Sequence, residues 1–411
     1  MNDSIDYPLP QGLHVIPKEL LDMRSDAEID HSILHPPPVT DEKNIWFFWH
    51  TGYASMHAYT KRNIRAWHRR LSKLGWTIRV LDRAPGSSSN ISNFLNTSDP
   101  TTFPRAFTNC TISGRYAAQH ASDLVRFPLL LRYGGAYADV GLLQIGDLDR
   151  LWRRTVADPR SPYEVLSYNL HGGLANYFMA SRPRNPLFRR CHRLLLALWA
   201  EADSDGGGKT STEGMSDSPL LAGVPLMSGS FTITEEDGRI VQAAEVRKML
   251  SDYIIQGQAI TLVMGLVDEE DGWDGPAYVA ERVYGVDWME GSQLINEFTG
   301  WDGRKAFELM SLALPKRGEA ETAEQTQARE IVEACLRRSF GFKLAHGLII
   351  RVYGCTLGSL WREHEGSDDV PGTYAHWLRY ATNYWNQDEL PAPLAFPVKE
   401  PLRRGPLLGG N

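Results

Sequence analysis

The chain has 411 residues, with 43 basic and 50 acidic side chains and a formal net charge of −7. This balance excludes a global electrostatic attraction to nucleic acid or to an anionic membrane. No apolar run reaches the roughly 20 residues that a membrane-spanning helix needs. The four cysteines show neither CxxC nor zinc-type spacing, and the N-terminus lacks signal-peptide features. We therefore expect a reduced, cytoplasmic chain without a transmembrane segment.

The first predicted elements follow a polar extension at residues 1–43, which ends in consecutive prolines that favour extended backbone. "NIWFFWHTG" from Asn44 indicates a buried strand and a turn. Ile64 and Trp67 belong to an amphipathic helical pattern, and "TIRVLD" from Thr77 alternates like a strand. Strand, helix and strand in this order predict an α/β fold with a mainly parallel sheet.

A second predicted helix begins near Arg115 and carries Asp123 and Arg126 on one face. Pro128 predicts a kink, and Gly134 with Gly135 a helix end. "AYADV" is the next predicted strand. "SPYEVLSYN" and "NYFMASRP" are two more, and "PLFRRCHRLLLALWAEA" and "AREIVEACLRRSF" are amphipathic helices. The glycine- and serine-rich stretch at 201–218 predicts a flexible surface loop.

Several common motifs are absent. "GGGKTS" resembles a phosphate-binding loop, but the first glycine of that pattern would fall at Asp203, and the segment follows a helix where the motif requires a strand. No GxGxxG follows a strand, and neither HExxH nor Gly-x-Ser-x-Gly occurs. These absences argue against dinucleotide-binding, metalloprotease and α/β-hydrolase sites.

Asp139 is the leading candidate for a functional side chain. "AYADV" places it at the carboxyl end of a strand, where open α/β sheets bind ligands. A carboxylate suits Mg²⁺ or Mn²⁺, and the glycines beside it would let a diphosphate approach the backbone. A helix cap or a surface salt bridge is the equally weighted alternative.

Asp123 and Arg126 form a second candidate group. Asp123 could accept hydrogen bonds from sugar hydroxyls while Arg126 binds phosphate. Spacing alone favours an ordinary intrahelical ion pair instead. Trp49, after the first strand, is either a core residue or a ring that stacks on a nucleobase or sugar.

Taken together, "NIWFFWHTG", "SDLVRFPLLLRYGGAYADVG" and "NYFMASRPRNPLFRR" resemble the capsular-polysaccharide-synthesis proteins, fungal and bacterial relatives of glycosyltransferase family 32. The similarity covers about residues 44–200 well and "GTYAHWLRYA" near the C-terminus more loosely. It implies a GT-A fold in which a DxD strand end holds a Mn²⁺ or Mg²⁺ diphosphate.

The resemblance also implies roles for single residues. Asp139 looks like the first DxD aspartate, Asp123 and Arg126 like the pair that grips the donor sugar and its phosphate, and Trp49 like the ring that stacks on the base. Gly141 stands where the second aspartate belongs. His376 is the candidate replacement metal ligand, with a structural role in an aromatic cluster as the favoured alternative.

The resemblance divides the chain into a nucleotide-sugar-binding core at 44–200, the loop at 201–218, an acceptor side with a helical C-terminal part at 219–395, and a tail at 396–411. It predicts a retaining glycosyltransferase that moves a hexose from a nucleotide diphosphate sugar, UDP favoured, to a hydroxyl of an acceptor. The fungal character of the motifs favours a secondary metabolite such as a terpenoid or polyketide. A polysaccharide acceptor, a non-catalytic nucleotide-sugar-binding module and another transferase chemistry are the alternatives.

Overall fold

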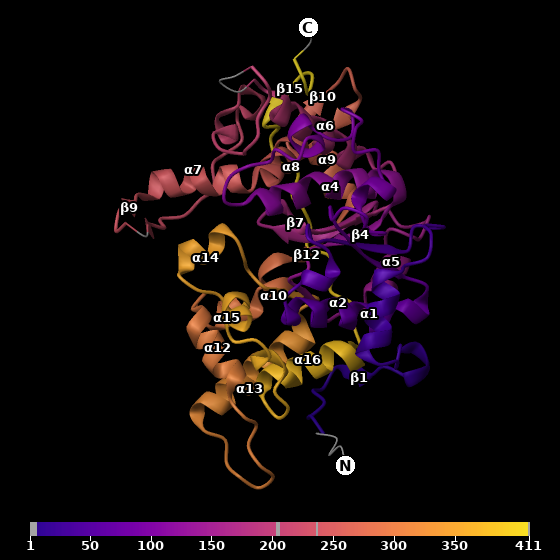
Figure 1. The fold of residues 1–411 in the computed structure, drawn as a ribbon, viewed down its shortest axis with the longest axis vertical. Coiled ribbons are helices and arrows are strands. Elements are labelled where there is room, and N and C mark those ends of the chain that lie inside the picture. The colour runs from indigo at the N-terminus through magenta and orange to yellow at the C-terminus, as the bar shows by residue number, and fades with distance from the viewer. Residues whose placement is uncertain (1–5, 203–205, 236, 410–411) are drawn as a thin grey trace.

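A computed structural model describes residues 6–202, 206–235 and 237–409. Its centre is a six-stranded sheet in the order β12–β6–β7–β4–β2–β3 (Figure 1). The bounds are β2 Asn44–Phe48, β3 Thr77–Leu81, β4 Gly135–Ala138, β6 Val165–Leu170, β7 Gly173–Ser181 and β12 Val283–Asp287. Every strand of this sheet is parallel to the others except β7, which runs antiparallel to β4 and β6. The mainly parallel α/β sheet predicted from the sequence is therefore confirmed.

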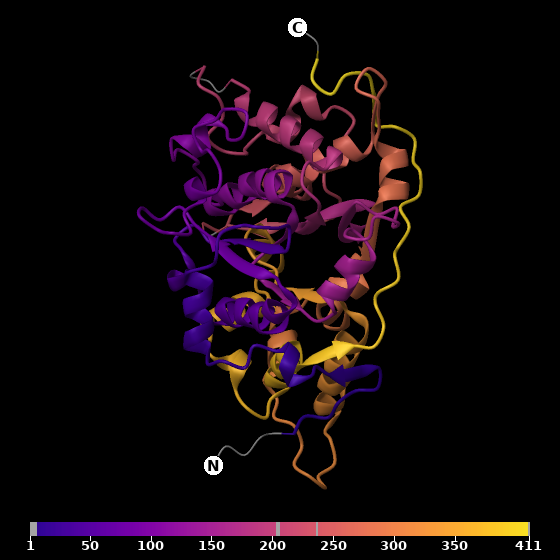
Figure 2. The ribbon, with the colours of Figure 1, turned by 90° about the vertical axis from the view of Figure 1, so that its right-hand side faces the viewer.

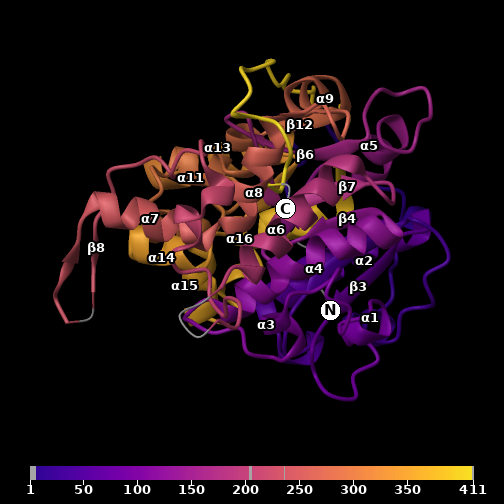
Figure 3. The ribbon, with the colours of Figure 1, turned by 90° about the horizontal axis from the view of Figure 1, so that it is seen from above.

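Helices cover both faces of this sheet. Leu124 of α4 (Ala117–Tyr133), Phe188 of α6 (Pro186–Ala200) and Ile260 of α8 (Ile255–Met264) share one core cluster, and these helices lie over one face (Figure 3). Ile29 of α1 (Asp26–Leu34) and Trp67 of α2 (Ala58–Leu71) pack into the cluster on the other face. The apolar stripe of each helix thus meets the sheet, as amphipathic periodicity requires.

A helical layer built from the C-terminal part of the chain lies below the sheet in Figure 1. Its helices are α11 Leu294–Phe298, α12 Gly303–Ser311, α13 Ala323–Arg338, α15 Leu357–Glu363 and α16 Tyr374–Tyr384. They surround a third core cluster that includes Met310, Val332 and Trp377. A short antiparallel pair, β5 (Leu142–Gln144) with β13 (Gly341–Lys343), joins this layer to the loop after β4.

The remaining elements are short. The helices are α3 Arg105–Thr108, α5 Leu148–Arg154, α7 Ala243–Tyr253, α9 Gly275–Arg282, α10 Trp288–Ser292 and α14 Leu348–Tyr353. The strands are β1 Leu13–Val15, β8 Ile233–Thr234, β9 Ile240–Val241, β10 Leu266–Asp268, β11 Trp273–Asp274, β14 Trp385–Gln387 and β15 Arg403–Arg404. Within the described ranges, no helix is both long and apolar enough to cross a bilayer.

The described parts of the N-terminal extension and the C-terminal tail pair with other elements of the fold. In the described part of the 1–43 extension, β1 pairs with β14, and α1 begins with a capping box between Ser25 and Glu28. The tail runs along the side of the molecule (Figure 2), buries Phe396 and pairs β15 with β10. Within the predicted loop at 201–218, residues 203–205 lie outside the described residues.

The helix end predicted at Gly134 is confirmed, whereas the kink predicted at Pro128 stays a prediction. α4 continues through Pro128 to Tyr133, and Gly134 ends it with a φ of +68°. The four cysteines are free thiols.

Candidate active site

The site is built at the carboxyl edge of the central sheet. Because β2, β4, β6 and β12 are mutually parallel, the residues that follow them lie along one edge. Trp49 follows β2, Asp139 follows β4, His171 follows β6 and Trp288 follows β12. Asp139 therefore stands between Trp49 on one side and the β6–β12 end on the other.

The backbone around Asp139 is fixed by close packing. Gly135, the first residue of β4, has a φ of +87°, and a β-carbon there would lie 2.3 Å from the carbonyl oxygen of Asn44. Only glycine fits this position. At the other end of the strand, the Asp139 N–H donates to the Tyr177 carbonyl at 2.8 Å. The carboxylate is thus presented from a strand whose position cannot shift.

Asp123, Arg126 and Asp139 converge. Arg126 Nη2 lies 3.0 Å from Asp123 Oδ1 and 3.0 Å from Asp139 Oδ1. Asp123 and Arg126 are buried, whereas 24% of the Asp139 side chain is exposed. The intrahelical pair and the strand-end carboxylate, separate candidates in the sequence, form one charged cluster.

Arg126 is a fixed bridge within this cluster. Its Nη1 donates to the Asn176 carbonyl at 2.8 Å and to Gln256 Oε1 at 3.1 Å, and its guanidinium lies 5.0 Å from the ring centroid of Tyr137. Burial lowers the pKa of Arg126, but the two aspartates outweigh it, so the pKa is raised and the charge is permanent. Arg126 consequently holds both carboxylates in place.

Lys343, which the sequence did not single out, is the second cation of the cluster. Its Nζ lies 3.0 Å from Asp139 Oδ2, and 14% of its side chain is exposed. Burial raises the pKa of Asp139, but Lys343 and Arg126 outweigh this effect and hold the pKa below its usual range. The cluster thus contains two carboxylates and two cations, which sum to no net charge.

His346 explains the glycine of the D-V-G sequence. A β-carbon on Gly141 would lie 3.0 Å from His346 Nε2 and 3.2 Å from the Leu344 carbonyl oxygen. The imidazole therefore fills the space that a second aspartate side chain would need. Burial, with Lys343 and Arg362, lowers the pKa of His346 to about 3, so the ring is neutral.

Trp49 is connected to this cluster by a series of rings. The Trp49 ring meets His57 edge-on at a centroid distance of 5.6 Å, and His57 stacks on Tyr59 at 6.0 Å. Tyr59 in turn lies 5.9 Å from His346. Trp49 is partly exposed at one end of this series, while His346 lies beside Gly141 at the other.

His376 lies elsewhere, in the C-terminal helical layer. Its Nδ1 is 2.5 Å from the Tyr7 hydroxyl, its Nε2 is 3.9 Å from Asp369, and its ring packs against Tyr7. This environment matches the alternative of a structural histidine in an aromatic cluster.

Whether a divalent cation fits can be tested on the donors around Asp139. Across the described parts of the chain, no group of three or more His, Cys, Asp or Glu side chains could hold a metal. The donors nearest the D-V-G segment are the Asp139 carboxylate, which is paired with Arg126 and Lys343, and the neutral His346 ring, whose Nε2 is 3.4 Å from the Tyr59 hydroxyl. Mg²⁺ and Mn²⁺ commonly take their other ligands from phosphate and water. Asp139, with His346 as the second candidate, would therefore hold a cation whose other ligands come from a diphosphate and water.

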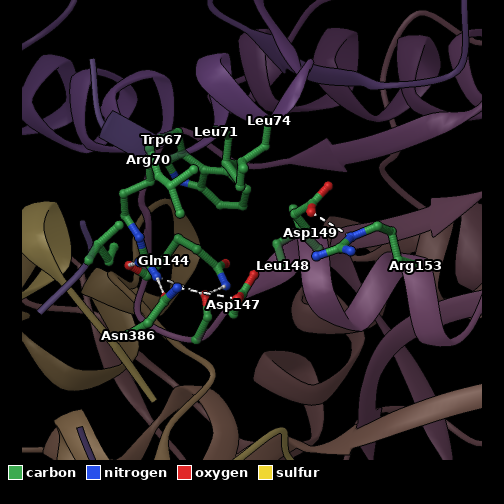
Figure 4. A pocket seen from close by; sticks show the side chains of 13 residues that line it. Trp67, Arg70, Leu71, Leu74, Gln144, Asp147, Leu148, Asp149, Arg153 and Asn386 are labelled. Atoms are coloured by element: carbon green, nitrogen blue, oxygen red, sulfur yellow. Dashed lines mark hydrogen bonds and ion pairs between the residues drawn. The ribbon is translucent and has the colours of Figure 1, made fainter. Parts of the chain in front are cut away.

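A separate cavity of about 100 Å³ lies between α2, α5 and β14 (Figure 4). Arg70 spans it and donates to the carbonyl oxygens of Gln144, Ile145 and Gly146. Because its guanidinium is committed to these backbone groups, the cavity is a structural junction between these elements.

The fold is that of an α/β protein, and its acidic and cationic side chains gather at the sheet edge where open α/β sheets bind ligands. The model of the capsular polysaccharide synthesis protein family matches residues 13–205. The chain is 31% identical to the O-glycosyltransferase braB of Annulohypoxylon truncatum, over 98% of this chain and 95% of braB. It is 34% identical to the glycosyltransferase afumC of Aspergillus fumigatus, over 92% of this chain and 94% of afumC.

A third relative, the O-glycosyltransferase PaGT of Phomopsis amygdali, is also 34% identical, over 94% of this chain and 92% of PaGT. A solved structure titled PaToxG Glycosyltransferase covers 57% of this chain and 83% of its own, with a TM-score of 0.27 and 14% identity, which is too low to assign the fold. The chain belongs to the capsular polysaccharide synthesis protein family, together with these fungal glycosyltransferases. The resemblance read from its motifs is thereby confirmed.

Proposed function

We propose that this glycosyltransferase moves a hexose from a UDP-sugar to a hydroxyl group of an acceptor, on a GT-A-type fold and with retention of the anomeric configuration. The observation that carries the proposal is the junction of Asp123 and Asp139 through Arg126 at the carboxyl edge of the sheet. Relatives named O-glycosyltransferases support the transfer to oxygen.

In this proposal the donor lies across the edge from Trp49 towards Asp123. Trp49 stacks on the base, since it is partly exposed after β2. Asp139 and Asp123 accept hydrogen bonds from ribose and sugar hydroxyls, because carboxylates are strong acceptors. Lys343, the more exposed of the two cations, faces the diphosphate, and Arg126 positions both carboxylates.

The reaction exchanges one bond for another. The bond between the anomeric carbon and the diphosphate oxygen breaks, a bond from that carbon to the acceptor oxygen forms, and the hydroxyl proton passes to the departing diphosphate. A Mn²⁺ or Mg²⁺ held by Asp139 and His346 would neutralise charge on the diphosphate as a Lewis acid. The charge balance supports this, because the two cations of the cluster already face two carboxylates.

The acceptor class we favour is a hydroxylated secondary metabolite such as a terpenoid or a polyketide. The support is the relation over nearly the full chain to fungal proteins named O-glycosyltransferases.

Isothermal titration calorimetry with UDP-glucose and GDP-mannose tests the donor part. Asp139→Asn should weaken binding of the preferred sugar nucleotide about tenfold or more, because a charge-assisted hydrogen bond contributes about 1.5–3 kcal/mol. Asp388→Asn is the control, since Asp388 is an exposed carboxylate paired with His14. Absence of binding by the unaltered chain, or equal binding by Asp139→Asn, would refute the proposal.

A further inference from the structure

Five aromatic rings from separate segments of the chain form a continuous row beyond the β6–β12 end of the sheet edge. They are contributed by the β6–β7 turn, α10, the connection between α11 and α12, α14, and the segment before β8, and are, in order, His171, Trp288, Trp301, Tyr353 and Phe231. None of the five is buried. We refer to this set as the aromatic row.

The rings at the centre of the row are offset rather than stacked face upon face. The Trp288 and Trp301 planes differ by 23° with centroids 6.0 Å apart, and the Trp301 and Tyr353 planes differ by 15° with centroids 5.3 Å apart. Parallel planes in contact are only about 3.5–4.0 Å apart. Neighbouring rings are therefore displaced sideways relative to each other, so each ring covers only part of the face of the next.

Trp301 is held in an unfavourable backbone conformation at the middle of the row. Its φ is +63°, in the left-handed region that non-glycine residues rarely adopt. Core packing does not explain this conformation, because neither Trp301 nor Tyr353 belongs to the four clusters or to the half-buried residues packed against them. The conformation belongs to the turn that ends α11, in which the Trp301 N–H donates to the Asn296 carbonyl at 2.7 Å, and this turn places the ring at a partly exposed position.

The aromatic row and Asp139 lie on the same edge. His171 follows β6, which is two strands from β4, a separation of about 10 Å at the usual strand spacing. Tyr353 ends α14, a helix that starts two residues after His346. Since His346 lies beside Gly141, the chain runs from the neighbourhood of the cluster directly into the helix that carries Tyr353. Trp49 is on the opposite side of Asp139, so the two aromatic regions flank it.

The surroundings of the row are apolar at its Phe231 end. Phe231 packs on a small cluster that includes Leu348, together with six other half-buried residues: Tyr116, Met227, Met249, Tyr253, Ile349 and Val352. Methionine side chains adapt readily to ligands of different shape. One charged neighbour, Arg351, is paired with Glu235 at 2.5 Å. Such a surface suits a flat hydrocarbon skeleton better than a chain of sugars.

We propose that the aromatic row is the acceptor platform, and that its occupant is a flat, apolar small molecule carrying the hydroxyl to be glycosylated. The inference rests on the proposed function, because it places the acceptor on the side of Asp139 opposite the nucleotide. The offset rings bind the skeleton through their uncovered faces and direct its hydroxyl towards Asp139.

The acceptor proposal is tested by binding 1-naphthol and the diterpene alcohol sclareol to the chain. Isothermal titration calorimetry measures their affinity in the presence of saturating UDP. Trp301→Asn should weaken binding of these probes about tenfold or more and leave UDP affinity unchanged. Asparagine tolerates positive φ, so the variant should keep the melting temperature. Tyr353→Ala should act in the same direction, whereas Trp301→Phe should retain most of the affinity.

Tyr384→Ala, which removes a half-buried ring from α16, is the control and should bind the probes normally. Equal probe binding by Trp301→Asn and the unaltered chain would overturn the proposal, as would probe binding by neither while UDP still binds. So would binding of maltotriose in place of the apolar probes, or a change of oligomeric state in Trp301→Asn by analytical ultracentrifugation. Failure of UDP itself to bind would instead refute the proposed function.

Discussion

His346 Nε2 lies 3.0 Å from the position that a β-carbon on Gly141 would occupy. The family resemblance makes residue 141 the place of the second DxD aspartate, and the structure fills that place with an imidazole from the C-terminal part of the chain. A carboxylate at residue 141 and a histidine at residue 346 therefore compete for one volume.

Gly141→Asp should consequently impair the site instead of completing it. Inserting side-chain atoms against His346 and the Leu344 carbonyl is overpacking, which costs about 1–3 kcal/mol, and displacing His346 should weaken UDP-sugar binding. Thermal unfolding and calorimetry measure both effects. Gly207→Asp is the matched control, because no atom lies within 4 Å of a β-carbon there and its φ is not positive. Tighter sugar-nucleotide binding by Gly141→Asp would show that the imidazole and the carboxylate are not alternatives.

Arg126→Met should destabilise the chain by about 3–5 kcal/mol, because it leaves the buried Asp123 and neighbouring Asp139 without their shared cation. Donor affinity should fall as well, since the two carboxylates would repel each other out of position. Urea unfolding and calorimetry with UDP-glucose check the two effects. Arg126→Lys keeps the charge but has no planar fork to reach both aspartates. The stability of this variant should therefore lie between that of the unaltered chain and that of Arg126→Met. If Arg126→Met bound UDP-glucose normally, Arg126 would not position the site.

Local patterns were sufficient to predict the central elements. The buried "NIWFFWH" run, the helix before Gly134 and the strand ending at Asp139 lie in consecutive segments, and each carries its own periodicity or stop signal. The same local signals placed Asp123 and Arg126 on one helix face, and the short connection from α4 to β4 brought Asp139 beside them.

The parts of the site that the sequence did not predict depend on contacts between segments far apart in the chain. Lys343 comes from β13, a three-residue strand that pairs with β5 almost 200 residues earlier, so no local pattern predicts its approach to Asp139. For the same reason, the sequence does not show that His346, and not His376, lies beside Gly141. By contrast, α1 carries a readable signal, the Ser25–Glu28 capping box, which the proline-rich context of the extension obscured.

Trp49→Ala should weaken UDP binding by about 1–3 kcal/mol, the usual contribution of an aromatic ring to stacking on a base. Inorganic pyrophosphate offers no base, so its affinity should not change. Calorimetry with both ligands makes the comparison, and Trp49→Phe should restore most of the UDP affinity. A parallel loss of pyrophosphate binding would mean that the ring supports the fold of the site and does not contact the base.

Asp368 fixes the C-terminal helical layer to α2 and offers a test of stability against pH. It is fully buried, and its Oδ2 lies 2.6 Å from Arg379 Nη2 of α16 and 3.0 Å from Arg62 Nε of α2. Burial raises the pKa of Asp368, but the two arginines outweigh it and lower the pKa. A lowered folded-state pKa means that the carboxylate stabilises the fold above its ordinary pKa near 4, and that this contribution is lost as the pH falls through the folded value.

Asp368→Asn should therefore lower the free energy of unfolding at pH 7 by about 3–5 kcal/mol, because Arg379 would remain buried without its carboxylate. The difference from the unaltered chain should shrink as the pH is lowered below about 4. Urea unfolding from pH 7 to pH 3 provides the measurement. Asp369→Asn is the matched control, since that neighbouring carboxylate is 46% exposed and 3.7 Å from Arg62, and exposed pairs contribute about 1 kcal/mol or less. Equal losses in the two variants at pH 7, or a difference for Asp368→Asn that stays constant down to pH 3, would show that the buried charge does not join the two layers.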